Sequence, residues 1–244
     1  MDLLFSVFRE FLKRDFAVIF LHRQDSLVPF EHELRSLRFE DFELDGQELK
    51  LSKPKLKLLQ DPNLEQDKLI QTFLCYHQHK QNLLKISYFS VADYLFLLGE
   101  SAKLLAPLGH RVIFFLAAAV SDFYLDDAFI SEHKISSSSA TLIENGLSIH
   151  LSPVPKFIRL LKEQLCPAAF IISFKLETDE TIVLKKAEEA LQRYGHDLVI
   201  ANVLSSRKEK VWLVHPDGRT DLIEKSESVP IEHDLVRGVS QIIN

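Results

Sequence analysis

The chain has 244 residues, of which 46% are hydrophobic. That is enough to bury a sizeable core, and the length fits one large α/β domain better than two independent ones. A formal net charge of −6, with no block of lysine or arginine, argues against a nucleic-acid-binding protein.

The two cysteines, Cys75 and Cys166, are far apart and match no metal or redox spacing. This favours reduced thiols in a cytoplasmic protein. Charged residues interrupt the apolar ones near the N-terminus, which argues against a signal peptide or membrane span. The longest apolar run, residues 112–120, is far shorter than the roughly 20 residues that cross a bilayer. We interpret it as a strand buried on both faces.

The apolar residues between positions 3 and 12 have helical spacing, so the chain is predicted to open inside a helix. Residues 16–22 then read as a buried strand, and the strand expected before such a helix is missing. Residues 24–62 are highly charged and are interpreted as an excursion outside the regular core, with short strands at most.

The remaining elements alternate between helix and strand. Ser90 is predicted to cap a helix, with Asp93 completing a capping box and Gly109 beyond the helix end. Helices are expected at residues 63–80, from Ser90 to a point before Gly109, at 155–164, at 179–194 and from 231 on. Strands are expected at 84–89, 111–119, 147–151, 169–174 and 197–202. A hairpin with a turn at 216–218 follows the last of these strands.

This alternation predicts an α/β fold. We expect a doubly wound, Rossmann-like, mostly parallel sheet with helices on both faces and a C-terminal β-hairpin. Ligands of such sheets bind beyond the carboxyl ends of the strands. Polar residues stand at three of those ends: Ser121 and Asp122; Lys175, Glu177 and Thr178; and Asn202, Ser205 and Arg207. From position alone, a ligand site and ordinary surface polarity explain them equally well.

Common catalytic motifs are missing from the sequence. The dispersed glycines form neither the dinucleotide fingerprint nor the phosphate loop, and no H-E-x-x-H or G-x-S-x-G occurs. Cys75, His77 and His79 alternate, and on a helix they would not converge on one metal. Lys134 precedes a serine run at 136–139 and reads either as a solvated lysine or as a mobile cation that closes over a phosphate. Lys175 and Glu177 read equally as a surface ion pair.

Five segments taken together are more specific. In order they are LAAAVSDFY (116–124), EHKI (132–135), VPK (154–156), AFIISFKLETD (169–179) and VIANVLSSRK (199–208). The set closely resembles the eukaryotic phosphopantothenoylcysteine synthetases, also called phosphopantothenate–cysteine ligases. The resemblance covers nearly the whole chain, loosely between residues 24 and 80, and includes FREFLKRDFAVIFLHR near the N-terminus.

The resemblance implies a ligase of coenzyme A biosynthesis. A nucleoside triphosphate activates the carboxylate of 4'-phosphopantothenate as an acyl-nucleotidylate, and the amino group of L-cysteine then attacks. ATP is implied for the eukaryotic branch and CTP for the bacterial one, with Mg²⁺ as companion and a homodimer as the assembly. Such chemistry needs charge stabilisation and accurate placement rather than an enzymic nucleophile.

The resemblance also implies roles for individual residues. Ala118, Ala119 and Asp122 correspond to positions that hold phosphopantothenate. Phe174 and Asn202 correspond to nucleotide contacts at the ends of their strands. Lys134 matches the catalytic lysine of a loop that covers the nucleotide.

The chain also departs from the family pattern. Members begin with a strand, a T-S-G-G-T-type turn and a segment like D-N-F-S-S-G-x-x-G, and the printed sequence contains neither glycine-rich segment. We therefore expect one phosphopantothenoylcysteine synthetase-like domain over residues 1–244, N-terminally shortened, with 24–80 as a variable excursion. Two hypotheses stay open: a shortened form of an active ligase, and a catalytically impaired homologue acting as a dimerisation or regulatory subunit.

Overall fold

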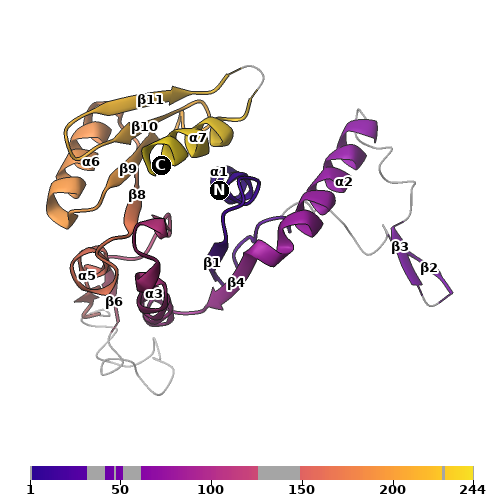
Figure 1. Ribbon diagram of the computed structural model, residues 1–244, viewed down its shortest axis with the longest axis horizontal. Coiled ribbons are helices and arrows are strands. Elements are labelled where there is room, and N and C mark those ends of the chain that lie inside the picture. The colour runs from indigo at the N-terminus through magenta and orange to yellow at the C-terminus, as the bar shows by residue number, and fades with distance from the viewer. Residues whose placement is uncertain are drawn as a thin grey trace, which may run out of the picture.

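The structure is a computed structural model that describes residues 2–31, 42–46, 48–51, 62–125, 149–226 and 229–243 (Figure 1). The α-helices are α1 (Asp2–Leu12), α2 (Pro62–His79), α3 (Val91–Leu105), α5 (Phe157–Leu160), α6 (Glu180–Tyr194) and α7 (Ile231–Ile243). The first strands are β1 (Val18–Arg23), β2 (Phe42–Asp45), β3 (Glu48–Leu51), β4 (Leu83–Tyr88), β5 (Ile113–Leu116), β6 (Phe123–Tyr124) and β7 (Ser152–Pro153). The others are β8 (Phe170–Glu177), β9 (Leu198–Val203), β10 (Lys210–Val214) and β11 (Thr220–Glu224).

The main sheet has five strands in the order β11-β10-β9-β8-β5. β5, β8 and β9 run parallel, with Phe115 opposite Ile172 and Phe174 opposite Ile200. The β10–β11 hairpin continues the sheet in antiparallel fashion from β9, as the hairpin prediction required. The fold is therefore α/β, and its five-stranded sheet is mixed because the hairpin adds two antiparallel pairings.

A second, separate sheet contains only β1 and β4, paired in parallel over their full length. Helix α1 lies against both sheets. The Phe8 ring is 4.7 Å between centroids from Phe20 of β1 and 5.8 Å from Phe115 of β5. Aromatic packing on α1 thus connects two groups of strands that share no backbone pairing among the described residues.

Alternating side chains of the main sheet pack against helices on opposite faces. Ile172 and Ile200 belong to a core cluster with residues of α1 and α7. Ile171, one residue away, packs with α3 and the turns that follow α5, while Val199 packs with α6. Helices on both faces, as predicted from the sequence, explain why every residue of β9 is buried (Figure 1).

Local signals read from the sequence explain several helix ends. The Ser90 side chain accepts from the Asp93 amide and the Asp93 carboxylate accepts from the Ser90 amide, which confirms the capping box. Asp179 caps α6 by accepting from the Thr181 amide at 2.8 Å. Gly195 ends α6 at φ 65°, a left-handed conformation that glycine adopts without strain.

Two predicted strands need correction. The strand expected over residues 111–119 ends at Leu116, and the following apolar residues, up to Val120 at 37% exposure, are not buried. Its last pairing is Leu116 with Ser173, after which the Val120 amide donates to the Ala118 carbonyl and bends the chain away. The second correction concerns the strand predicted at 147–151. Its described residues, 149–151, pair with no other strand, and the paired strand β7 begins at Ser152.

Within the described ranges, no helix is long and apolar enough to cross a bilayer. The predicted location in the cytoplasm stays a prediction.

Candidate functional site

The chain after β5 forms an exposed turn that carries three of the predicted substrate-binding residues. Ala118, Ala119 and Asp122 are all exposed. The Ser121 hydroxyl donates to the Phe123 carbonyl at 2.7 Å, which tightens the turn. Small side chains in an exposed turn leave the backbone approachable, as a substrate-holding segment requires.

Asp122 is held against the segment that precedes α5. Its carbonyl accepts from the Val154 amide at 2.9 Å, next to the short β6–β7 pairing. Its carboxylate Oδ1 lies 3.1 Å from the Lys156 ammonium, and both side chains are exposed, at 77% and 55%. The hydrogen bond to Asp122 raises the pKa of Lys156, and Tyr194 nearby adds to the rise, while the modest burial of the ammonium works against it.

The strand expected at 169–174 runs on to Glu177, because its pairing with β9 continues past Phe174. Phe174 therefore lies in the middle of β8 rather than at its end, half-buried, with its ring 4.9 Å from that of Phe115. The two rings meet at 64°, edge to face. Phe115 also contacts Phe8 and Phe11 of α1. Phe174 is therefore part of the aromatic core beneath α1, and the part of the ring that stays exposed is what a bound base would meet.

Asn202 lies near the end of β9 and is only 6% exposed. It is opposite Leu176 and two residues beyond Ile200, so it occupies the same sheet face as Phe174. Among the described residues its carboxamide has no hydrogen-bond partner, and its nitrogen and oxygen are not among the fully buried unpaired atoms, so they touch solvent. An amide that touches solvent on the same sheet face as a half-buried aromatic ring suits a ligand that brings donors and acceptors of its own.

The other polar strand-end residues are engaged in ion pairs and turns. Glu177 pairs with Lys175 at 3.2 Å and with Lys186 at 2.9 Å. The hydrogen bond from Lys186 is the main reason that the pKa of Glu177 is lowered. Arg207 donates to the Leu204 carbonyl at 2.6 Å. The ion-pair interpretation of Lys175 and Glu177 is thus confirmed.

The structure brings together some of the predicted site residues and not others. Phe174 and Asn202 share one face of the main sheet, and Ala118, Ala119 and Asp122 share one turn. Lys134 and the serine run at 136–139 lie outside the described residues. Lys156 has no role in the sequence-based prediction, because a lysine before a helix is common; only its motif neighbours, Val154 and Pro155, hinted at a fixed position.

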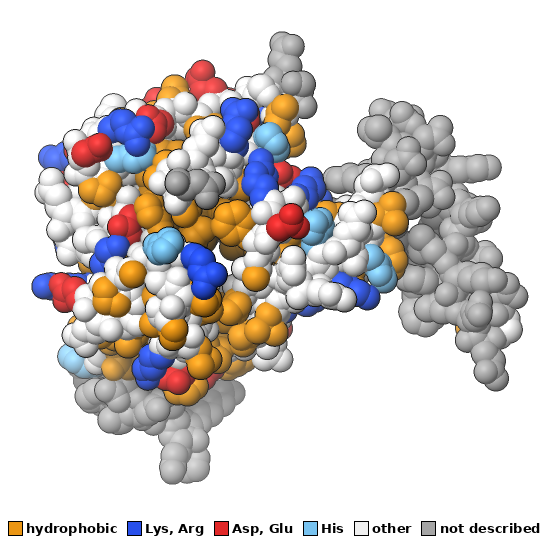
Figure 2. Space-filling model, viewed as in Figure 1, with side chains coloured by type: hydrophobic (Ala, Val, Ile, Leu, Met, Phe, Trp, Pro, Cys, Tyr) orange, Lys and Arg blue, Asp and Glu red, His pale blue; other side chains and the backbone are white. Residues whose placement is uncertain are grey.

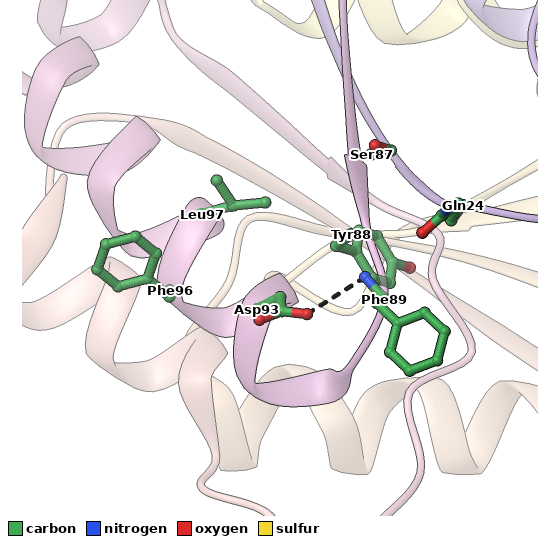
Figure 3. Close-up of a pocket in the computed structure, with 7 residues that line it drawn as sticks. All are labelled: Gln24, Ser87, Tyr88, Phe89, Asp93, Phe96 and Leu97. Carbon is green, nitrogen blue, oxygen red and sulfur yellow. Dashed lines mark hydrogen bonds between the residues drawn. The ribbon is translucent and has the colours of Figure 1, made fainter.

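A cavity of about 330 Å³ that the sequence did not suggest opens at the carboxyl ends of β1 and β4 (Figure 3). It is lined by Gln24, Ser87, Tyr88, Phe89, Asp93, Phe96 and Leu97. The Asp93 carboxylate Oδ2 accepts from the Phe89 and Ser90 amides as part of the helix cap, and no described group bonds its Oδ1. The Phe89 and Phe96 rings lie apart on either side of Asp93, and none of the predicted site residues lines this cavity.

The described residues contain no group of three or more His, Cys, Asp and Glu side chains that could hold a metal ion. Cys75, His77 and His79 lie along α2 and are not part of such a group. Both thiols are free, and burial raises the pKa of each, which disfavours a reactive thiolate.

Comparison with known proteins identifies the family. Residues 101–242 match the DNA/pantothenate metabolism flavoprotein C-terminal domain. The chain is 37% identical over 235 residues to the human phosphopantothenate–cysteine ligase, covering 93% of this chain and 72% of that protein. The chain belongs to the phosphopantothenate–cysteine ligase family, of the eukaryotic type.

Other members of this family agree in sequence and in fold. The ligase CAB2 of Saccharomyces cerevisiae is 36% identical over 228 residues, which is 86% of this chain and 59% of that protein. The solved structure of the Cab2 mutant H337A, also solved in complex with phosphopantothenate-cysteine, superposes with a TM-score of 0.81 at 34% identity. That match covers 98% of this chain and 75% of the free mutant. The chain thus spans between about three fifths and three quarters of these ligases.

Proposed function

We propose that this chain carries the substrate-binding half of a phosphopantothenate–cysteine ligase, which joins 4'-phosphopantothenate to L-cysteine through an acyl-nucleotidylate in coenzyme A biosynthesis. The observation that carries the proposal is the fold match over 98% of the chain to a family member bound to phosphopantothenate-cysteine. A doubly wound, Rossmann-like fold belongs to the same proposal.

In this proposal the residues of the exposed turn hold phosphopantothenate. The small side chains of Ala118 and Ala119 let backbone amides approach the ligand, and the Asp122 carboxylate accepts hydrogen bonds from its hydroxyl or amide groups. Phe174 offers an aromatic face to the base, and Asn202 gives the base or ribose edges the hydrogen bonds that the structure leaves unmade. Lys134 supplies positive charge to the reacting α-phosphate.

The nucleotide is proposed to be ATP with Mg²⁺. The described residues offer no cluster of metal ligands, so they do not form a metal cage of their own. Mg²⁺ commonly binds mainly through substrate phosphates and water, and none of the steps assigned to side chains here depends on it. A homodimer and a cytoplasmic location are likewise part of the proposal, as is a single domain over residues 1–244.

A second function is a catalytically impaired homologue that serves as a dimerisation or regulatory subunit. The observation that favours it is that the chain spans only 72% of the human ligase and 59% of CAB2 of Saccharomyces cerevisiae. The two functions share the fold, so only a measurement of catalytic activity distinguishes them.

Two measurements on the 244-residue chain distinguish these functions: phosphopantothenate binding by calorimetry, and an assay of ligase activity. We expect 4'-phosphopantothenate to bind the wild type and to bind Asp122→Ala at least tenfold more weakly, about 1.4 kcal/mol. We expect only weak pyrophosphate release, dependent on both phosphopantothenate and cysteine. Release at ordinary enzyme rates would exclude the impaired homologue, and failure to bind either phosphopantothenate or nucleotide would refute the ligase proposal.

A further inference from the structure

Lys156 stands out as a cation that the assigned roles leave unused. It is the residue immediately before α5, and Pro155 restricts the backbone leading into it. Val154, two residues earlier, is 7% exposed and anchors the segment in the protein. The Lys156 backbone therefore has a fixed place, although its ammonium reaches solvent.

The same segment fixes Asp122 through backbone and side chain together. The Val154 amide donates to the Asp122 carbonyl at 2.9 Å, and the Lys156 ammonium lies 3.1 Å from carboxylate Oδ1. Among the described residues, no group bonds the second carboxylate oxygen, Oδ2. One oxygen is thus engaged by the lysine, while the other stays open for a ligand.

An isolated exposed ion pair contributes little to stability, typically about 0–1 kcal/mol. The Lys156–Asp122 pair differs from such a pair because Val154, two residues before Lys156, donates a backbone hydrogen bond to Asp122, which holds the two segments together. Its consequence is orientation: the pair restricts the rotamers of the Asp122 side chain.

We propose that Lys156 is a positioning residue of the candidate site, which orients the Asp122 carboxylate so that Oδ2 accepts a hydrogen bond from phosphopantothenate. This inference rests on the proposed function. It gives a role to the VPK segment, whose lysine acts through Asp122 rather than on the reacting atoms.

The test measures phosphopantothenate binding by calorimetry for the wild type, Lys156→Met, Lys156→Arg, Asp122→Asn and the double variant. We expect Lys156→Met to weaken binding about tenfold and Lys156→Arg to restore it to within about threefold of the wild type. The double variant should bind no more weakly than Asp122→Asn, because the lysine acts only through the carboxylate. A purely structural role would show neither rescue by arginine nor this lack of additivity.

Lys103→Met is the matched control, since Lys103 forms a 2.6 Å ion pair with Glu100 on the exposed side of α3. It should leave binding unchanged. If Lys156→Met bound phosphopantothenate as tightly as the wild type, the positioning role would be overturned while the proposed function would stand. Losses that multiply in the double variant would also overturn it, by showing that Lys156 contacts the substrate directly. A wild type that binds no phosphopantothenate overturns the proposed function, and the positioning role with it.

Discussion

The main sheet and the β1–β4 pair are built from similar apolar sequences but differ in burial. Every residue of β9 is buried, since it has a neighbouring strand on each side and helices on both faces. In β1 the single buried residue is Phe20, and Leu84 of β4 is 54% exposed. An apolar strand is therefore not a buried strand until its edges and faces are covered.

Incomplete covering of apolar residues is also visible on the surface. Hydrophobic side chains gather in the middle of the face shown in Figure 2, where α1 and α3 lie. Phe96 and Leu104 of α3 are 67% and 79% exposed. The main sheet thus supplies the framework for Phe174 and Asn202, whereas the β1–β4 pair is joined to it by side-chain packing on α1 and α3, without backbone pairing among the described residues.

Truncating one leucine in each region tests this difference with the same chemical change. Leu198 of β9 is fully buried, so Leu198→Ala should lower the free energy of unfolding by about 3 kcal/mol, from lost burial and the cavity left behind. Leu84→Ala should cost less than about 1 kcal/mol because that side chain is largely in water already. Urea denaturation followed by circular dichroism measures both values; equal losses would erase the distinction between the regions.

The main sheet should also carry the acid sensitivity of the fold. His196 is 2% exposed, its Nε2 lies 2.9 Å from the Ser173 hydroxyl, and its Nδ1 is buried without a partner. Burial lowers the pKa of His196 to about 4, although the neighbouring Asp197 opposes the shift. Below pH 6.5 the unfolded chain binds the proton that the folded chain excludes, so stability is lost as the pH falls from about 6.5 to 4.

That loss amounts to at most about 3 kcal/mol, the free-energy equivalent of the pKa difference. Unfolding free energies measured between pH 7 and 4 should fall for the wild type and fall much less for His196→Gln. Lys162 and Asp197 form a 2.7 Å pair next to this histidine, so Asp197 must be intact in the comparison. Parallel pH profiles for the two proteins would show that His196 does not dominate the acid response.

Helices and strands were predictable from the sequence where capping residues or an apolar run match the burial found in the structure. The run at 197–202 is apolar and becomes the buried β9, and Ser90, Asp93 and Asp179 cap the predicted helices. The end of β5 was not predictable, because Ala118 to Val120 are apolar in sequence and only the missing pairing beyond Leu116 exposes them. Apolar composition alone cannot show where a ladder stops.

The candidate site was predictable in part for the same reason. Sequence position located Asp122 and Asn202 after apolar runs, but the burial of Asn202 and its unpaired carboxamide depend on packing that no local pattern encodes. Lys156 was missed because its link to Asp122 joins positions 34 residues apart. The roles assigned to Ala118, Ala119, Asp122, Lys134, Phe174 and Asn202 all remain predictions.

Amide hydrogen exchange can sharpen the comparison residue by residue. The amides of Ile200 and Ala201 in β9 should exchange only through global unfolding. Those of Phe20 and Leu21 in β1 should exchange through local opening at a free energy lower by roughly 2 kcal/mol, because their strand has few covering contacts. Mass spectrometry of peptides over the two strands, in increasing urea, measures both. Matching opening free energies would mean that the two sheets unfold as one unit.

The smallest effect compares two helix caps. Ser90 caps α3, which packs on β4 and also shares a core cluster with Phe114 and Ile171 of the main sheet, whereas Asp179 caps α6, which packs on β9. Each cap changed to alanine should cost about 1 kcal/mol of helix stability. For Asp179→Ala the whole loss should appear in the global free energy of unfolding, since α6 is inseparable from the main sheet. For Ser90→Ala, part of the loss should appear instead as faster exchange in α3 and β4. A full global loss for Ser90→Ala would show that the β1–β4 pair unfolds together with the five-stranded sheet despite its exposure.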